Sequence, residues 1–337
     1  MTKLLCALLL CIALPVEAAP TDELLQKINA HVVRVQVALA NGAYGVGSGV
    51  VVAKDQVVTN CHVIANATNI GVVSNGENFS VSAIKPDWHH DVCILKVEGL
   101  NAPVATIGSS KNLKYEQAVF AVGYPDFSMS PCATFGFVKG LFRMDDSVVI
   151  RATSTFRQGA SGGGVFDDDG NLVGVIALKS PGRNAYYYNL PVEWVQALLS
   201  KPEQAINTNS ELPFWAENEQ KWPYFMRVVQ PYLTEDWQAL LTVASQWAAQ
   251  DPNSSEALFY LAAAEYATND ISNAENHLHQ VVAINKRHSQ AIYYLALIAE
   301  ENGKHTEALN NVALLDHLDV TTADQLKLAM GITGSSR

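Results

Sequence analysis

The chain has 337 residues, of which 22 are basic and 33 are acidic, so its net charge is −11 at pH 7. This acidic balance argues against nucleic acid or an anionic lipid surface as a partner. The length favours more than one domain.

The first 18 residues have the features of a secretory signal peptide. Lys3 precedes an apolar stretch that ends at Leu14, and small residues lead to a cleavage site after Ala18. The stretch is too short to span a bilayer comfortably, and a buried N-terminal helix is the weaker alternative. Lipid attachment at Cys11 is disfavoured because a bulky leucine precedes it. We therefore expect a mature protein in the periplasm or outside the cell, without stable membrane insertion.

Two polar residues adjoin predicted strands in the first third of the chain. His62 follows the apolar pair Val57 and Val58, which is typical of a strand that delivers a side chain to a defined place. Asp91 begins the apolar run 91–97, so its carboxylate is expected next to the core. A carboxylate there needs a partner, such as the N–H of His62.

The segment 158–163, Gln-Gly-Ala-Ser-Gly-Gly, can supply a nucleophile together with oxyanion donors. A serine hydroxyl needs a base to take its proton and donors to stabilise the oxyanion. Glycines around Ser161 permit a tight turn that aims the N–H groups of Gly159 and Ser161 at one point. Taken alone, this segment could be an ordinary hairpin turn. The order His, Asp, Ser along the chain favours catalysis.

At these residues the chain resembles the trypsin-like serine proteases, and specifically their bacterial HtrA (Deg) branch. The resemblance implies two perpendicular six-stranded β-barrels, with His62 as general base, Asp91 orienting it and Ser161 as nucleophile. It also implies an oxyanion hole formed by the N–H groups of Gly159 and Ser161, and peptide-bond hydrolysis in polypeptide substrates without metal or organic cofactor. The matching segments are residues 44–51, 59–63, 91–97, 121–125, 158–163, 172–176 and 189–191.

Departures from the family pattern bear on regulation and specificity. Ala160 stands where digestive members have an aspartate that pairs with a new N-terminus, so we expect no zymogen step. The segment 127–144 is a candidate regulatory loop for the oxyanion hole.

In the substrate pocket, the uncharged Thr155 at the base disfavours a preference for Lys or Arg. The pocket walls are expected to be Ala177, Leu178 and Lys179 on one side and Tyr187 near the other.

Tyr187 allows two interpretations. It stands where many relatives have glycine, so it could make the pocket shallow and favour small apolar substrate side chains. The alternative is that its ring points to solvent and has no bearing on specificity.

Three cysteines remain once Cys6 and Cys11 leave with the signal peptide. A disulfide between Cys61 and Cys93 is plausible, because these residues lie next to His62 and Asp91, which the triad would bring together. Free cysteines in the core are the alternative. The pairing of Cys132 is left open.

We expect no metal site. The sequence has no CxxC pair, and His89 and His90 are expected in a solvated turn before Asp91. The acidic run 167–169 lacks the alternate spacing of a calcium loop and is typical of a hairpin turn.

The sequence changes character near residue 200, and helical spacing dominates from residue 215 onward. Phe259 and Tyr293, like Ala262 and Ala296, are 34 residues apart, and Gly303 fits the turn between paired helices. This period resembles tetratricopeptide (TPR) repeats. The helices 215–232 and 237–250 would form a divergent first repeat. Such an array could bind a partner protein or peptide in a groove, or could cap the protease by packing against it.

The predicted fold class is multidomain, an all-β double β-barrel of the trypsin-like kind followed by an all-α TPR-like helical repeat domain. The expected boundaries are 1–18 for the signal peptide, 19–200 for the protease domain, 201–214 for a linker and 215–330 for the repeats. We predict a secreted or periplasmic serine endopeptidase with a TPR module for protein interaction. The alternative is a catalytically silent adaptor that works through its repeats.

Overall fold

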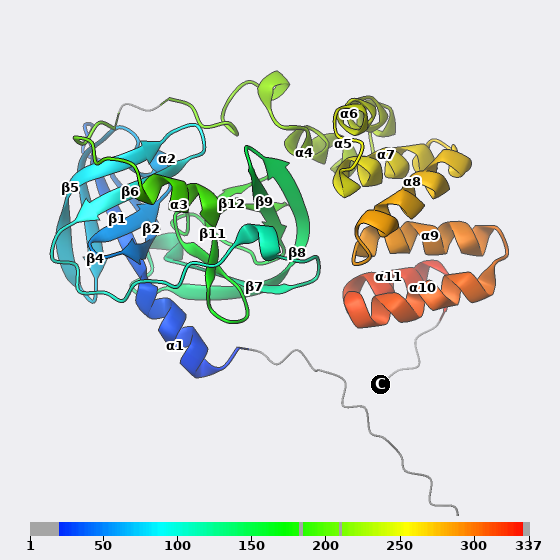
Figure 1. Ribbon diagram of the computed structural model, residues 1–337, viewed down its shortest axis with the longest axis horizontal. Helices are drawn as coiled ribbons and strands as arrows, with labels where there is room; N and C mark the ends of the chain where they lie inside the picture. Colours follow the sequence, from blue (N-terminus) through cyan, green and yellow to red (C-terminus); the bar gives the residue numbers. More distant parts are fainter. Residues whose placement is uncertain (1–19, 182–184, 209–210, 333–337) are drawn as a thin grey trace, which may run out of the picture.

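The computed structural model describes residues 20–181, 185–208 and 211–332. The predicted signal peptide, with Cys6 and Cys11, lies outside the described residues. Figure 1 shows two β-barrels side by side and a group of helices beyond the second barrel. Within the described ranges, no helix is long and apolar enough to cross a membrane.

The first barrel closes through antiparallel strands in the order β1-β2-β3-β6-β5-β4. Its strands are rich in valine and isoleucine, whose branched side chains pack well on a pleated surface. Burial alternates along β1, where Val33, Val35 and Val37 lie in the barrel core. The strand bounds are β1 (Val32–Leu39), β2 (Tyr44–Ala53), β3 (Gln56–Thr59), β4 (Ala67–Ser74), β5 (Glu77–Asp87) and β6 (Val92–Val97).

The second barrel closes in the order β10-β11-β12-β9-β8-β7. Val119, Ile150 and Val173 are among the residues of its core. Strand β8 occupies residues 132–144, so most of the segment 127–144 that we expected to be a regulatory loop is paired in the sheet. The bounds are β7 (Ala118–Gly123), β8 (Cys132–Met144), β9 (Ser147–Ala152), β10 (Gly164–Phe166), β11 (Leu172–Lys179) and β12 (Tyr187–Pro191).

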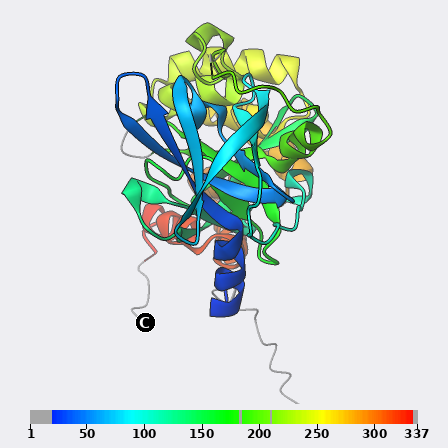
Figure 2. The same ribbon diagram turned by 90° about the vertical axis from the view of Figure 1, so that its left-hand side faces the viewer.

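Short helices accompany the barrels. In Figure 2 the first barrel faces the viewer and α1 (Asp22–His31) extends from its lower end. Helix α3 (Val192–Leu199) follows the last strand of the second barrel. The remaining short elements here are α2 (Cys61–Ile64) and the 3₁₀ turns η1 (Ser110–Asn112) and η2 (Pro125–Phe127). A further 3₁₀ turn, η3 (Glu219–Lys221), lies after the linker.

The predicted linker is attached to the first barrel over part of its length. Gln204 exchanges two backbone hydrogen bonds with Ile84 of β5, at 2.8 and 3.0 Å. The Thr208 carbonyl accepts from the N–H of Asn66 at 2.9 Å, and its hydroxyl donates to Ala67 at the start of β4. These contacts lead the chain along the first barrel before it reaches the helical region.

The helical region fits TPR-like repeats. Helices α6, α8 and α10 begin at residues 237, 271 and 305, each 34 residues after the one before, and α7 and α9 begin at 255 and 289 with the same interval. The predicted helix 215–232 is wrong: the structure has only a 3₁₀ turn and two short helices there, with Pro223 and Pro231 interrupting the pattern. The bounds are α4 (Tyr224–Arg227), α5 (Val229–Leu233), α6 (Trp237–Gln250), α7 (Ser255–Ala267), α8 (Ile271–Ile284), α9 (Ser289–Glu301), α10 (His305–Leu318) and α11 (Val320–Ala329).

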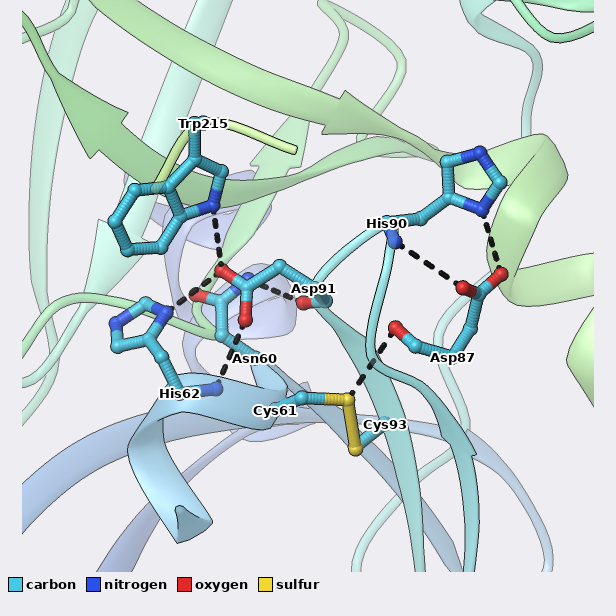
Figure 3. Close-up of a disulfide and its surroundings, with 8 residues drawn as sticks. All are labelled: Asn60, Cys61, His62, Asp87, His90, Asp91, Cys93 and Trp215. Atoms are coloured by element: carbon cyan, nitrogen blue, oxygen red, sulfur yellow. Dashed lines mark hydrogen bonds and ion pairs between the residues drawn. A yellow bond between two sulfur atoms is a disulfide. The ribbon is translucent and has the colours of Figure 1, made fainter. Parts of the chain in front are cut away.

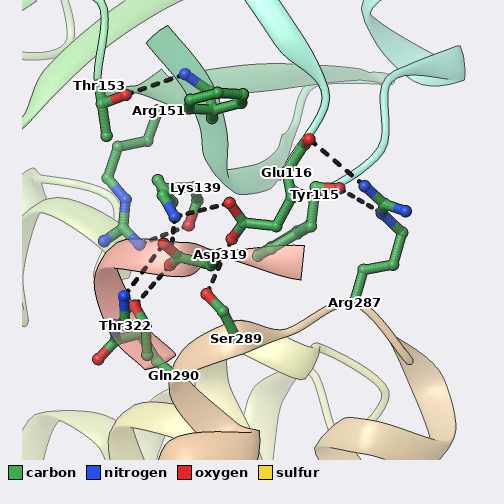
Figure 4. Close-up of polar contacts among 11 residues, drawn as sticks. Tyr115, Glu116, Lys139, Arg151, Thr153, Arg287, Ser289, Gln290, Asp319 and Thr322 are labelled. Atoms are coloured by element: carbon green, nitrogen blue, oxygen red, sulfur yellow. Dashed lines mark hydrogen bonds and ion pairs between the residues drawn. The ribbon is translucent and has the colours of Figure 1, made fainter. Parts of the chain in front are cut away.

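Charged groups join the helical region to the second barrel (Figure 4). Lys139 of β8 bridges the carboxylates of Glu116 and Asp319, with both N–O distances at 2.6 Å. The buried Arg151 of β9 donates to the Tyr260 hydroxyl of α7 at 2.8 Å. Buried charges are costly unless they are paired, so these pairs fix how the helices dock.

A second group of contacts lies beside the first. The Tyr115 hydroxyl donates to the buried Glu256 carboxylate of α7, which also faces His288 Nε2 at 3.1 Å. Burial raises the pKa of Tyr115, and the charge of Glu256 raises it further, so the phenol remains a donor. Arg287 donates to the carbonyl of Tyr115 at 2.6 Å. The ends of α7 and α9 are therefore held against the barrel.

Candidate active site

His62 lies just after the end of β3 and Asp91 just before the start of β6, in the first barrel. His62 is on α2, directly after β3, and Asp91 occupies the turn before β6 with a left-handed φ of 59°. The two strands are neighbours, and Thr59 pairs with Cys93 across them. This register brings the two side chains together although they are 29 residues apart.

The Asp91 carboxylate holds His62 at two points, as Figure 3 shows. Its Oδ1 accepts from the backbone N–H of His62 at 2.8 Å, and its Oδ2 lies 2.7 Å from Nδ1 of the ring. An ionised carboxylate can only accept, so Nδ1 carries the proton and Nε2 is left with a lone pair. Asp91 is fully buried, whereas the His62 side chain is 31% exposed. This geometry makes His62 Nε2 available as a base.

A third donor to Asp91 comes from outside the barrels. The indole N–H of Trp215, just after the linker, donates to Asp91 Oδ2 at 3.2 Å. The Trp215 ring also meets the His62 ring edge to face, with centroids 5.5 Å apart and an interplanar angle of 89°. Nothing in the sequence pairs these residues, because they are 124 positions apart and Trp215 lay in the predicted first helix of the repeats.

A disulfide joins Cys61 and Cys93 directly beneath this site, with an S–S distance of 2.03 Å. Cys61 precedes His62, and Cys93 follows Asp91 by two residues. The bond therefore ties the segment that carries the imidazole to strand β6, which begins directly after Asp91 (Figure 3). Cys132 is free and exposed.

The Ser161 turn packs against the first barrel. The Ser161 carbonyl accepts from the N–H of Ser48 in β2 at 2.8 Å. The adjacent Gly162 has a φ of +86°, and a Cβ there would lie 2.3 Å from Oγ1 of Thr59 in β3. Ser161 therefore sits against the strand that leads into His62. Its hydroxyl makes a weak 3.5 Å contact with the Ala177 carbonyl.

Two hydrogen bonds hold the backbone around Gly159. Its carbonyl accepts from the buried Ser48 hydroxyl at 2.8 Å, and its φ is +92°. The preceding Gln158 carbonyl accepts from the N–H of Asp126 at 2.8 Å. In a trans peptide the C=O and N–H point in opposite directions, so the N–H of Gly159 points away from Asp126.

Two backbone donors are left over in this turn. Within the described ranges, the N–H groups of Gly159 and Ser161 make no hydrogen bond to the protein, whereas those of Ala160, Gly162 and Gly163 do. A pair of unused N–H groups beside a serine hydroxyl can bind an oxyanion.

The predicted substrate pocket residues lie at the ends of β9, β11 and β12. Thr155 is exposed, and its carbonyl accepts from the Thr134 hydroxyl at 2.6 Å. Tyr187 pairs with Lys179 across the two strands, and its ring meets that of Phe156 edge to face with centroids 5.0 Å apart. Tyr187 thus packs on the protein.

The other two predicted wall residues differ in exposure. Ala177 is buried, and Leu178 is partly buried at a register shift between β11 and β12. Such a shift marks a local irregularity in the pairing of β11 with β12.

Comparison with known proteins supports a trypsin-like peptidase domain. Residues 47–175 match the model of the trypsin-like peptidase domain family. The chain is 34% identical over 160 residues to a probable periplasmic serine endoprotease DegP-like from Pseudomonas putida, and 37% identical over 159 residues to one from Pseudomonas fulva. These alignments cover 45% and 44% of this chain but only 33% of each relative.

A solved structure shares the fold over part of this chain. The crystal structure of the Rv3671c protease from M. tuberculosis in its active form aligns with a TM-score of 0.52 and 24% sequence identity. The alignment covers 57% of this chain and 92% of that chain.

Proposed function

We propose that this chain is a serine endopeptidase of the HtrA type, with His62, Asp91 and Ser161 as its catalytic triad. The buried Asp91 carboxylate carries the proposal, because it accepts from both the N–H and the Nδ1–H of His62 and leaves Nε2 as a base. A silent adaptor would have no use for this arrangement. Similarity to periplasmic endoproteases supports action in the periplasm or outside the cell, after cleavage at Ala18.

The proposed reaction has two halves. Ser161 Oγ leaves its contact with Ala177 and attacks the carbonyl carbon of a peptide bond, while His62 Nε2 takes its proton. The tetrahedral intermediate breaks the C–N bond, and His62 gives the proton to the leaving amine. Water then attacks the acyl-enzyme with His62 again as base, which releases the acid product and restores the Ser161 hydroxyl.

The N–H groups of Gly159 and Ser161 are the proposed oxyanion donors. Their lack of partners in the described part of the chain and the positive φ of Gly159 support a hole that is formed before substrate arrives. Donors set in place in advance stabilise developing charge without reorganisation during the reaction. Ser48 would hold this arrangement, because its hydroxyl binds the Gly159 carbonyl.

The pocket formed by Thr155, Ala177, Leu178, Lys179 and Tyr187 is proposed to accept small apolar side chains. The packing of Tyr187 on Phe156 supports a shallow pocket. Thr155 offers no charge for a Lys or Arg side chain. Profiling of cleavage sites in an unfolded protein should show small apolar residues before the cut bond, and a dominance of basic or aromatic residues would contradict this.

For the helical region, residues 215–330, we propose a role as a cap docked on the peptidase unit, residues 19–200, through the linker 201–214. Glu256 and Tyr260 on α7 and His288 at the start of α9 are buried at this junction, which favours docking over a groove that is free to bind peptides. Through Trp215 the cap also touches the triad.

Hydrolysis of an unfolded protein such as casein tests the proposed function. The mature protein should release peptides, and Ser161→Ala should abolish release while keeping its circular dichroism spectrum. Ser200→Ala, at an exposed serine after α3, is the matched control and should remain active. Casein hydrolysis that persists in Ser161→Ala would contradict the proposal.

A further inference from the structure

Three side chains of kinds that can bind a metal lie close together, two from the first barrel and one from the second. His89 and His90 lie in the turn before Asp91, and Asp145 lies in the hairpin between β8 and β9. One ligand atom from each lies within 4.8 Å of the other two. The sequence predicted a solvated turn here, because Asp145 is 55 residues from His90.

The His90 ring is oriented for ligation. Asp87 Oδ2 lies 2.6 Å from Nδ1 of His90, and Asp87 Oδ1 accepts from the backbone N–H of His90 at 3.1 Å (Figure 3). The Trp194 ring packs against the His90 ring at a tilt of 32°, with centroids 4.0 Å apart. A carboxylate on one ring nitrogen is the usual second partner of a histidine that binds a metal through the other.

The other ring nitrogen of His90 faces a second carboxylate. Its Nε2 lies 3.1 Å from Oδ2 of Asp145. With the Nδ1 proton directed at Asp87, these two atoms are both acceptors and repel each other unless a proton or a cation lies between them. In a tetrahedral site with bonds of about 2.0 Å, neighbouring ligand atoms are about 3.3 Å apart, close to the separation seen here.

We propose that His89, His90 and Asp145 bind a Zn²⁺ ion, with Asp87 as the outer carboxylate that orients His90. Two imidazoles and one carboxylate suit zinc, whereas calcium and magnesium prefer oxygen ligands alone. Because His89 is exposed, its ring can turn to complete the set. Three protein ligands leave one position for water.

The site is connected to the triad through the chain. The His89 carbonyl accepts from the N–H of Phe214 at 2.9 Å, and the next residue, Trp215, donates to Asp91. An ion bound here would link the turn before Asp91 to the second barrel and hold it in place. Binding should therefore raise the melting temperature of the protein as zinc is added.

Isothermal titration of the tag-free mature protein with ZnCl₂ tests the site and requires no catalytic activity, so its outcome is independent of the proposed function. One equivalent should bind, and CaCl₂ should give no heat. Asp145→Asn and His89→Ala should each weaken binding at least tenfold, and Asp87→Asn about 10- to 100-fold. Asp146→Asn, the neighbouring exposed hairpin position, is the matched control and should bind as the wild type does.

Both ligand variants alter exposed side chains, and circular dichroism verifies that they fold. Absence of zinc binding to the wild type would overturn the proposal. Zinc binding that Asp145→Asn and His89→Ala leave unchanged would also overturn it, because the ion would then sit elsewhere.

Discussion

The indole N–H of Trp215 donates to Oδ2 of Asp91 at 3.2 Å, on the same oxygen that faces Nδ1 of His62. A residue at the start of the helical region thus takes part in satisfying the buried carboxylate. Since Trp215 follows the linker, the position of the helical region and the geometry of the triad are coupled through one side chain.

Trp215→Phe should slow catalysis without unfolding the protein. Loss of a hydrogen bond to a charged group costs about 1.5 kcal/mol, which corresponds to roughly a tenfold lower kcat with KM little changed. Steady-state kinetics on a peptide substrate measures both constants. Trp222→Phe is the matched control. The indole N–H of Trp222 donates to the Glu217 carbonyl at 2.8 Å, and not to a residue of the triad. Equal losses in the two variants would rule out a positioning role for Trp215.

Gly159→Ala should disable the oxyanion hole. The added Cβ would lie 2.5 Å from the Tyr124 carbonyl, at a backbone φ of +92°. The turn must shift to relieve this contact, so we expect kcat to fall about 10²- to 10³-fold, as for loss of an oxyanion donor. Gly76→Ala has a similar φ of +83° with open space around the Cβ, so it serves as the control for backbone strain alone. Full activity in Gly159→Ala would refute the proposed hole.

Removal of the Cys61–Cys93 disulfide should destabilise the protein. The bond closes a loop with a sequence separation of 32, for which chain entropy predicts a loss of about 3–4 kcal/mol in the free energy of unfolding. Urea denaturation of the double variant Cys61→Ala, Cys93→Ala measures this loss. Cys132→Ser, at the exposed free cysteine, should leave the unfolding midpoint unchanged. An unaltered midpoint in the double variant would show that the bond contributes nothing to stability.

Acid should weaken the docking of the helical region. Burial by itself raises the pKa of Asp319, but hydrogen bonds from Lys139 and Thr322 outweigh it and hold this pKa below its usual 3.8. Burial by itself also raises the pKa of Glu256. The hydrogen bond with His288 and the charge of His288 outweigh burial and hold this pKa below 4.5. A carboxyl with a lowered folded pKa stabilises the protein above its unfolded pKa, and this contribution is lost as the pH falls through the folded value.

The free energy of unfolding should therefore decrease as the pH falls below about 4.5. Burial raises the pKa of Glu116. A carboxyl with a raised folded pKa stabilises the protein as the pH falls, so Glu116 offsets part of the loss in the free energy of unfolding. Urea denaturation between pH 6 and pH 3 should show a smaller decrease for Asp319→Asn than for the wild type. Asp324→Asn, at an exposed position of α11, should follow the wild type. A steeper decrease of the free energy of unfolding in Asp319→Asn would contradict the predicted stabilisation by the Asp319 carboxylate.

Local patterns predicted much of the fold. Apolar runs beside polar turns indicated the strands around His62 and Asp91, and the 34-residue period anticipated the starts of α6, α8 and α10. The strands depend on residues that are neighbours in the chain, and the helix starts depend on a repeated unit. Both kinds of pattern can be recognised in a single sequence. The helix 215–232 was predicted wrongly because its helical composition outweighed Pro223 and Pro231.

The contacts that were missed depend on tertiary docking. Trp215 meets Asp91 only because the linker is attached to the first barrel at Gln204 and Thr208. Asp145 meets His90 only because the two barrels pack together. The sequence does not predict either contact. Each joins two segments that are far apart in the chain, and the pattern of each segment can be explained without the contact.

Labelling of the mature protein with a fluorophosphonate probe tests the central claim most directly. The probe forms a covalent bond with a serine only when a base and an oxyanion hole activate it. We predict stoichiometric labelling of the wild type and none of Ser161→Ala. Absence of labelling in the folded wild type, or labelling that persists in Ser161→Ala, would contradict the assignment of Ser161 as the nucleophile.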